Sequence, residues 1–356
     1  MNIIIDKIEY IPENCLLELC FKCNLNCKHC GSSINAFSKK RQGRELTKNE
    51  FMKVIQELKM LGGKKIGLVG GEPLLYEFWE DIAIYAKSLG FELSMISNGM
   101  LIDRIMADRI KKSGINKVAL SLDGPRDFHN ILRGNVHAFD HVLSAADFLI
   151  SAGVQVNIIT TIMNKNIDLL DEIEKIVENI KASFWQLQIG VPMGKLKFNS
   201  DLLLEPQRIV EVEQFILKSK KRNKVEITVA DSIGYCSNNE LILRNNSSTD
   251  GTRAFLGCMA GCRAVAIESN GNIKGCLSLQ NDNFIEGNVL KNSLTEIWRS
   301  ANSFQYNRKF KKENLSGECT TCKYGLICRG GCTSMAYNAS GSINNNPYCI
   351  SLYQKN

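Results

Sequence analysis

The sequence lacks the features that would place the chain in a membrane or outside the cell. Among its 356 residues, no apolar run approaches the roughly 18 residues that span a bilayer. The first residues have neither a basic stretch leading into an apolar one nor a small-residue cleavage site. Hydrophobic residues make up 44% and charged residues 23%, as in ordinary globular proteins. We therefore expect a cytoplasmic protein with no membrane partner.

The sequence also lacks a basic face interleaved with aromatic residues, which nucleic-acid binding would favour. Its net charge of +7 is small and scattered. The basic run at residues 218–224 is typical of the solvated end of a helix, where cations suit the helix dipole. We expect no nucleic-acid partner, and an acidic peptide is the alternative partner for such a patch.

No cysteine lies between residues 31 and 235, although the chain contains 14. Five cysteines lie at residues 15–30 and nine at residues 236–349. This density is below that of a disulfide scaffold, and the cytosol keeps ordinary cysteine pairs reduced. The two clusters therefore predict metal ligands.

The cysteine-free middle alternates β-rich runs with amphipathic helical runs. Strands are expected at residues 15–20, 65–69, 92–97, 117–123, 155–162 and 184–191. Helices are expected at residues 49–61, 78–88, 104–112, 139–151, 168–180 and 208–222. A capping box from Thr47 to Glu50 starts the first helix. Left-handed glycine caps end four of the helices before the next strand, at Gly62, Gly90, Gly114 and Gly153.

Strict alternation of six β/α units predicts an α/β fold with a parallel sheet, right-handed crossovers and helices outside. Six units are too few for a closed eight-unit barrel, so we expect an open partial (β/α)6 barrel. The alternation ends near residue 233. We therefore expect a barrel domain at residues 1–235 and a cysteine-rich domain at residues 236–356. Metal ligation would supply folding free energy to this second domain, which has little core of its own.

The first cysteine cluster contains Cys23, Cys27 and Cys30 in Cys-x3-Cys-x2-Cys spacing after the first strand. Three thiolates can hold three corners of a four-iron cluster and leave one iron open. A closed zinc site is the alternative, with His29 as its fourth ligand.

Polar and glycine-rich segments follow the next three strands. They are Gly70-Gly71-Glu72-Pro73, Ser97-Asn98-Gly99 and Ser121-Leu122-Asp123-Gly124-Pro125. The carboxyl ends of parallel strands share one mouth, so these segments should meet the three cysteines there. Taken singly, the second segment is also typical of a plain turn and the third of a plain loop. Arg133 by itself is equally consistent with a surface arginine. His129, His137 and His141 are expected to be structural or at the surface.

In order and separation, these motifs together resemble the radical SAM enzymes over nearly the whole chain. The resemblance implies that Cys23, Cys27 and Cys30 bind a [4Fe-4S] cluster whose open iron binds S-adenosyl-L-methionine. It implies that Glu72, beside Gly70 and Gly71, accepts the methionine ammonium, and that His29 lies beside the adenine. The same resemblance puts Ser97 and Asn98 near the ribose. It gives the ribose and the carboxylate to Ser121, Asp123 and Arg133.

The second cysteine cluster has Cys258-x12-Gly-x4-Cys276 spacing, then Cys319-x2-Cys322-x5-Cys328-x3-Cys332, and finally Cys349. This pattern resembles the SPASM extension of radical SAM enzymes, whereas a pair of zinc ribbons is the alternative. The resemblance implies two auxiliary clusters and three [4Fe-4S] clusters in all. The first auxiliary cluster would use Cys258, Cys276 and Cys332, with Cys262 as an added ligand. The second would use Cys319, Cys322, Cys328 and Cys349. We expect Cys15, Cys20 and Cys236 to be small buried residues.

The resemblance implies an enzyme that cleaves S-adenosyl-L-methionine to a 5′-deoxyadenosyl radical and takes hydrogen from its substrate. Gly31-Ser32-Ser33 after Cys30 resembles the pyrroloquinoline quinone and mycofactocin maturases more than the sulfatase-maturing group. We therefore predict a ribosomal precursor peptide as substrate, crosslinked or otherwise oxidised, and a flavodoxin or ferredoxin-type electron donor. A separate leader-peptide-binding protein is expected, because only 22 residues precede Cys23. Formylglycine generation, small-molecule dehydrogenation and a zinc-bound scaffold remain the alternatives.

Overall fold

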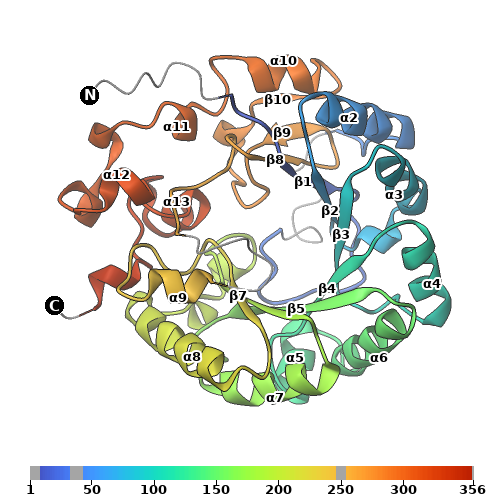
Figure 1. Ribbon diagram of the computed structural model, residues 1–356, viewed down its shortest axis with the longest axis horizontal. Helices are drawn as coiled ribbons and strands as arrows, with labels where there is room; N and C mark the ends of the chain where they lie inside the picture. The colour runs from blue at the N-terminus through green and yellow to red at the C-terminus, as the bar shows by residue number, and fades with distance from the viewer. Residues whose placement is uncertain (1–8, 33–42, 246–253, 355–356) are drawn as a thin grey trace.

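The computed structural model describes residues 9–32, 43–245 and 254–354. Its centre is a ten-stranded sheet in the order β10-β9-β8-β1-β2-β3-β4-β5-β6-β7. Neighbouring strands from β8 through β7 run parallel, whereas β9 and β10 pair antiparallel at one edge. Figure 1 shows this sheet curled into an incomplete ring with helices on its outside. The predicted partial barrel is confirmed.

The six expected strands all form, in the predicted order. They are β1 Asn14–Glu18, β2 Lys65–Val69, β3 Glu92–Ser97, β4 Lys117–Ser121, β5 Gln155–Ile162 and β6 Phe184–Ile189. Three of them end two residues earlier than predicted, β1, β4 and β6, so their last expected residues belong to the loops at the barrel mouth. Residues of β5 and β6 alternate between buried and half-buried, which separates the core face from the barrel interior.

The six expected helices also form. They are α2 Lys48–Met60, α3 Trp79–Ser88, α4 Arg104–Lys112, α6 Ala138–Ser151, α7 Leu170–Ile180 and α8 Ile209–Arg222. The capping box at Thr47 and Glu50 is present. The four predicted cap glycines all adopt left-handed backbone angles, with φ between 75° and 89°. Within the described part of the barrel domain, one α-helix was not predicted: α5, Arg126–Arg133, lies directly after Pro125.

The C-terminal segment adds strands to the barrel sheet. Beyond the predicted strands lie β7 Ile227–Val229, β8 Ala264–Ile267, β9 Asn272–Lys274 and β10 Gly287–Asn288. Strand β8 pairs in parallel with β1, with Ala264 opposite Asn14. The sheet therefore continues past residue 236.

Short helices complete this segment and lie beside the gap in the ring (Figure 1). They are α9 Glu240–Arg244, α10 Leu294–Arg299, α11 Gln305–Arg308, α12 Gly325–Cys328 and α13 Thr333–Ser340. Leu294, Trp298 and Met335 are buried in the same hydrophobic core as the barrel strands. The segment therefore shares the barrel core, so its folding does not depend on metal ligands alone.

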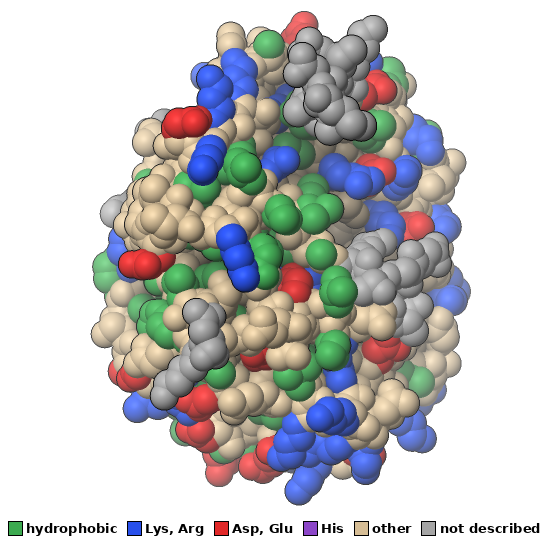
Figure 2. Space-filling view, turned by 60° about the vertical axis from the view of Figure 1, so that its left-hand side comes forward, with side chains coloured by type: hydrophobic (Ala, Val, Ile, Leu, Met, Phe, Trp, Pro, Cys, Tyr) green, Lys and Arg blue, Asp and Glu red, His purple; other side chains and the backbone are tan. Residues whose placement is uncertain are grey.

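None of the helices in the described ranges has both the length and the hydrophobicity of a transmembrane segment. Figure 2 shows hydrophobic side chains across the middle of one face and Lys and Arg side chains at its lower end. The basic run that ends α8 has acidic partners on α7: Arg222 lies 2.8 Å from Asp171, and Lys224 lies 3.1 Å from Glu178. The run lies at the end of a helix, as the sequence indicated, and the structure adds its pairing with carboxylates of α7.

Candidate functional site

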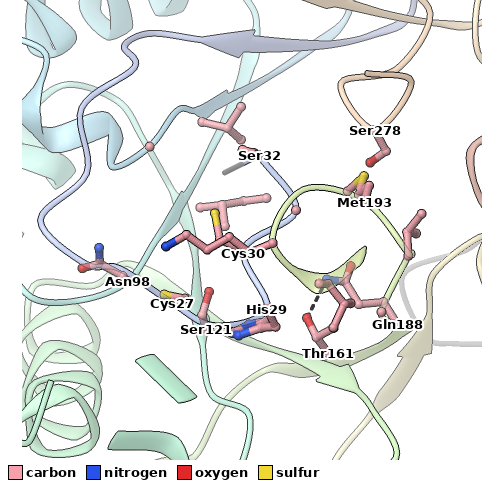
Figure 3. Close-up of a pocket in the computed structure, with 18 of the residues that line it drawn as sticks. Cys27, His29, Cys30, Ser32, Asn98, Ser121, Thr161, Gln188, Met193 and Ser278 are labelled. Atoms are coloured by element: carbon pink, nitrogen blue, oxygen red, sulfur yellow. Dashed lines mark hydrogen bonds between the residues drawn. The ribbon is translucent and has the colours of Figure 1, made fainter. Parts of the chain in front are cut away.

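A cavity of about 460 Å³ opens at the carboxyl ends of the barrel strands. Cys23, Cys27 and Cys30 line it, together with residues that follow β2, β3, β4, β5, β6 and β7. Cys276 and Cys332 of the C-terminal segment also line it. Figure 3 shows Cys27, His29 and Ser121 on one side and Met193 and Ser278 on another. The cavity therefore joins the two cysteine clusters, which are far apart in the sequence.

Gly71 fixes the cysteine loop against the end of β2. A Cβ atom on Gly71 would lie 2.1 Å from the carbonyl oxygen of Lys22 and 3.0 Å from Cys23 Cβ. The amide of Glu72 donates to that same Lys22 carbonyl at 2.8 Å. Only glycine allows this approach, because any side chain would push the loop away. Gly71 thus allows the cysteine loop to pack directly against the end of β2.

Two polar side chains reach the sulfur atoms of this loop. Asn98 Nδ2 lies 3.9 Å from Cys23 Sγ and donates to Asn24 Oδ1 at 2.8 Å. Arg133 Nη1 lies 3.8 Å from Cys27 Sγ. Such hydrogen bonds to thiolate sulfur are among the factors that set the potential of an iron–sulfur cluster. Asn98 therefore supports the cysteine loop from the end of β3, in addition to lining the cavity.

Within the described ranges, no three His, Cys, Asp or Glu side chains gather closely enough to hold a single metal ion. A zinc ion draws four ligands to about 2.0–2.3 Å from one centre. The thiolates of a four-iron cluster each bind a different iron and stand farther apart. Three cysteine thiolates that line one cavity are the ligand set of the cluster, whereas a closed zinc site needs a fourth ligand.

Glu72 is a buried carboxyl group, 1% exposed, at the cavity wall. It accepts hydrogen bonds from Ser97 Oγ at 2.8 Å and from the Asn98 amide at 2.9 Å. Burial raises the pKa of Glu72 to about 7, and these hydrogen bonds offset only part of that effect. No cation contributes to its pKa among the described residues. A positively charged ligand group would restore its ionised form, so Glu72 is suited to bind an ammonium.

Arg133 and Asp123 form a buried ion pair behind the cavity. Asp123 is fully buried, and Arg133 Nε donates to its Oδ2 at 2.9 Å. Burial alone would raise the pKa of Asp123, but the charge of Arg133 outweighs it and brings this pKa to about 2. Arg133 reaches the cavity whereas Asp123 does not. Asp123 therefore positions Arg133 and has no surface of its own for a ligand.

His29 lies at the cavity wall with its Nε2 atom 3.4 Å from Asp123 Oδ2. Burial lowers the pKa of His29 to about 4, more than the nearby carboxylate raises it, so the imidazole is neutral at pH 7. Its Nδ1 atom is buried without a hydrogen-bond partner in the described structure. The neutral imidazole of His29, with its unsatisfied Nδ1 atom, is better suited to contact a nucleobase than to bind a metal ion, for which the three cysteine thiolates are available.

The remaining predicted positions fall in two groups. Ser97 and Ser121 line the cavity, although the Ser97 hydroxyl is already bound to Glu72. His129 is buried and its Nδ1 accepts from the Asp123 amide at 3.2 Å, which makes it structural. His137 and His141 are exposed.

Gln188 of β6 lines the cavity and donates to Thr161 Oγ1 at 3.1 Å across the ends of β5 and β6 (Figure 3). Two further cavity residues were not predicted. Lys195 reaches Asn26 of the cysteine loop. Asp231, two residues beyond β7, lines the cavity as a carboxylate with 58% of its side-chain surface exposed. The alternating run before Asp231, Val-Glu-Ile-Thr-Val, is the signal that would have predicted a seventh strand and this carboxylate.

The predicted ligands of the first auxiliary cluster lie close together. Burial first, and then the neighbouring Cys258 and Cys276, raise the pKa of Cys332. Cys262 is buried and interacts electrostatically with Cys258, but it does not line the cavity with Cys276 and Cys332. The buried hydroxyl of Tyr306 has no hydrogen-bond partner in the described structure, and burial together with the neighbouring cysteines raises its pKa. The donor atoms fit a sulfur-rich group at this place.

The predicted ligands of the second auxiliary cluster line a second, smaller cavity, together with Cys236. Its thiol-bearing residues are Cys236, Cys319, Cys322, Cys328 and Cys349. Cys15 and Cys20 are buried as predicted. The prediction for Cys236 was wrong, because its side chain is only partly buried and makes a hydrogen-bond contact with Cys328. The sequence separation of Cys236 from the other four cysteines concealed this proximity.

Comparisons with known proteins agree with this architecture. Residues 17–182 match the Radical SAM superfamily, and residues 258–323 match SPASM, described as an iron-sulfur cluster-binding domain. The chain belongs to the radical SAM enzymes that carry a SPASM domain. It is therefore an enzyme chain with sites for S-adenosyl-L-methionine and for iron–sulfur clusters.

Individual relatives differ in what they are named for. An AdoMet-dependent heme synthase of Nitratidesulfovibrio vulgaris is 28% identical over 91% of this chain and 88% of its own. The mycofactocin maturase MftC of Mycolicibacterium smegmatis is 26% identical over 90% of this chain and 78% of its own. Streptococcus suis SuiB bound to S-adenosylmethionine shares the fold, with a TM-score of 0.72 and 16% identity over 97% of this chain and 78% of its own.

Proposed function

We propose that this enzyme cleaves S-adenosyl-L-methionine reductively and oxidises a carbon–hydrogen bond of a ribosomally made peptide. The observation that carries the proposal is the single cavity shared by Cys23, Cys27 and Cys30 with Cys276 and Cys332. A substrate in this cavity would lie between two sets of thiolates that suit iron–sulfur clusters. This arrangement suits an oxidation that begins at one cluster and passes an electron to another.

The cavity residues divide the binding of the cofactors among them. Cys23, Cys27 and Cys30 would hold the first [4Fe-4S] cluster; when bound, it and S-adenosyl-L-methionine supply a radical that takes hydrogen from unactivated carbon. Glu72 would bind the methionine ammonium, and Arg133 would bind its carboxylate as a charged fork. The nucleoside would lie against residues that line the same wall: His29 at the adenine, and Ser97, Asn98 and Ser121 on the ribose side.

The C-terminal cysteines would hold two auxiliary clusters, giving three [4Fe-4S] clusters in all. Cys258, Cys276 and Cys332 would form the first site, with Cys262 next to Cys258 as an added ligand. Cys319, Cys322, Cys328 and Cys349 would form the second. Cys276 and Cys332 line the main cavity and interact with Cys258, whereas the second set lines a separate, smaller cavity, which supports this division.

The charges in the cavity favour a peptide over a polycarboxylate substrate. Among the described lining residues, the cations are Arg133 and Lys195, and the carboxylates are Glu72 and Asp231. Arg133 and Glu72 are assigned to the methionine group, which leaves Lys195 and Asp231, one charge of each sign, for the substrate. A site for several carboxylates needs a surplus of cations, which this lining does not provide. The likeness to a mycofactocin maturase also supports a maturase role.

Asp231 is suited to remove the proton that such an oxidation releases. Loss of a hydrogen atom and then an electron from a carbon centre leaves a proton on the substrate. Asp231 lines the cavity that Cys276 and Cys332 share, so its carboxylate can reach a substrate there as a general base. Arg244 Nη1, 3.6 Å away, holds the carboxylate in place.

Two partners complete the proposal. Reductive cleavage needs one electron, which a flavodoxin or ferredoxin-type donor would supply. A separate leader-peptide-binding protein would present the precursor peptide.

The test is anaerobic reconstitution with iron and sulfide, followed by reduction in the presence of S-adenosyl-L-methionine. We expect 5′-deoxyadenosine from the wild type and none from a C23A/C27A/C30A variant. Candidate precursor peptides are then added, and a mass change in one of them is expected. Wild-type protein that forms no 5′-deoxyadenosine would reject the chemistry. Turnover of a sulfatase peptide motif or a free sugar alone would reject the substrate class.

A second candidate function is the decarboxylation of an iron porphyrin. It is favoured by the likeness to AdoMet-dependent heme synthases over 91% of this chain. Incubation with iron coproporphyrin under the same conditions separates the two candidates. Release of carbon dioxide from the porphyrin, with no change in any peptide, would favour this second function.

A further inference from the structure

The second auxiliary site contains one thiol more than a four-iron cluster needs. Cys319, Cys322, Cys328 and Cys349 already supply four ligands, which is the full complement of such a cluster. Cys236 lines the same small cavity as these four. It lies 83 residues before the first of them, outside any regular spacing.

The position of Cys236 is set by contacts on both sides. The side chain of Cys236 makes a hydrogen-bond contact with that of Cys328. The backbone carbonyl of the preceding residue, Tyr235, accepts from Cys349 Sγ at 3.5 Å. The Tyr235 ring is buried against Phe255, with ring centroids 4.9 Å apart. Cys236 is therefore held at the site by its neighbours and is not a small residue filling a core.

We propose that Cys236 and Cys328 share one corner of the second auxiliary cluster, so that either thiolate can bind the same iron. This inference rests on the proposed second cluster. Exchange between them is a ligand substitution: one thiol loses its proton and binds the iron, while the other thiolate leaves and is protonated. No electron is transferred, and no oxidant is required. Cys236 also interacts electrostatically with Cys349 and Cys322, but its hydrogen-bond contact is with Cys328, which favours this corner.

The first test needs no substitution. Holoprotein is treated with iodoacetamide under anaerobic conditions, and each cysteine is then examined by peptide mass spectrometry. One thiol of the Cys236 and Cys328 pair should be alkylated and the other protected by iron. Cys15, which is 2% exposed, serves as the internal control and should stay unmodified in folded protein. Alkylation of both thiols, or of neither, would overturn the proposal.

The second test measures iron and sulfide in variants. C236A and C328A should each keep all iron, with the remaining thiol of the pair protected from alkylation. C236A/C328A leaves three thiolates, which can hold a cluster with one open iron, so this variant should lose about one iron per chain on mild oxidation whereas each single variant should not. C322A is the matched control, and it should lose the same iron even though Cys236 is present. Loss of this iron in C328A alone, or its retention in the double variant, would overturn the shared corner.

These outcomes also separate this inference from the proposed cluster itself. Wild-type protein in which Cys319, Cys322 and Cys349 are all alkylated has no second cluster, and the proposed cofactor set then fails as well. Wild-type protein with those three thiols protected keeps the cluster, and the variants then decide the role of Cys236 alone.

Discussion

The buried ion pair of Asp123 and Arg133 makes the sharpest prediction about this protein. Asp123 is fully buried, and Arg133 is 9% exposed. Replacing Asp123 by Asn keeps the size of the side chain but leaves the guanidinium buried without its counter-charge. Breaking a buried pair in this way costs about 3–5 kcal/mol. That is a large part of the roughly 5–15 kcal/mol that stabilises a folded protein.

A double-variant cycle tests this reasoning. Equilibrium urea unfolding of the cluster-free protein gives the free energy of unfolding for the wild type, D123N, R133M and D123N/R133M. We expect each single variant to lose about 3–5 kcal/mol and the double variant to recover to within about 1 kcal/mol of the wild type. The double variant should nevertheless fail to bind S-adenosyl-L-methionine. Single variants that lose under about 1 kcal/mol, or losses that simply add, would refute the buried pair.

The same pair makes a prediction about pH. The pKa of Asp123 in the folded protein, about 2, lies below the unfolded value of about 3.9. Because the folded pKa is lowered, Asp123 contributes its stability above pH about 4 and loses it as the pH falls toward 2. The difference in unfolding free energy between the wild type and D123N should therefore be constant above pH about 4 and shrink below it. A difference that stays constant down to pH 2 would contradict the lowered pKa.

Three further predictions concern the cavity. G71A should lose about four irons per chain and all 5′-deoxyadenosine formation, because its Cβ would lie 2.1 Å from the Lys22 carbonyl oxygen. G31A is the control: its Cβ would meet only the end of a flexible side chain, so this variant should keep its iron and its 5′-deoxyadenosine formation. In cluster-loaded wild type, the affinity for S-adenosyl-L-methionine should fall about tenfold per pH unit below pH about 7, because Glu72 takes up a proton there. Calorimetry of E72Q should show weaker binding whose affinity lacks this pH dependence. D231N should still form 5′-deoxyadenosine but lose about 10²–10⁴-fold in product formation, and an equal loss of both products would assign Asp231 to cofactor binding instead.

The positions of the barrel strands and helices were readable from local patterns. Glycines at the ends of helices and the alternation of apolar residues depend only on near neighbours, so the six predicted strands and six predicted helices formed in order. Helix α5 escaped prediction because it has only eight residues and directly follows Pro125, in a segment that is typical of a loop. Yet this helix places Arg133 beside Asp123 and Cys27.

The sequence by itself determined which residue types are available for chemistry: the two cysteine clusters and the polar segments after the strands. The short spacing of Cys23, Cys27 and Cys30 also placed their three thiolates in one loop, because residues so close in the sequence stay close in space. Only the tertiary structure decided which distant residues meet. The closing of the sheet between β1 and β8 brings Cys276 and Cys332 to the cavity of Cys23. Long-range packing likewise placed Cys236 against Cys328, because contacts across 92 residues leave no trace in local spacing.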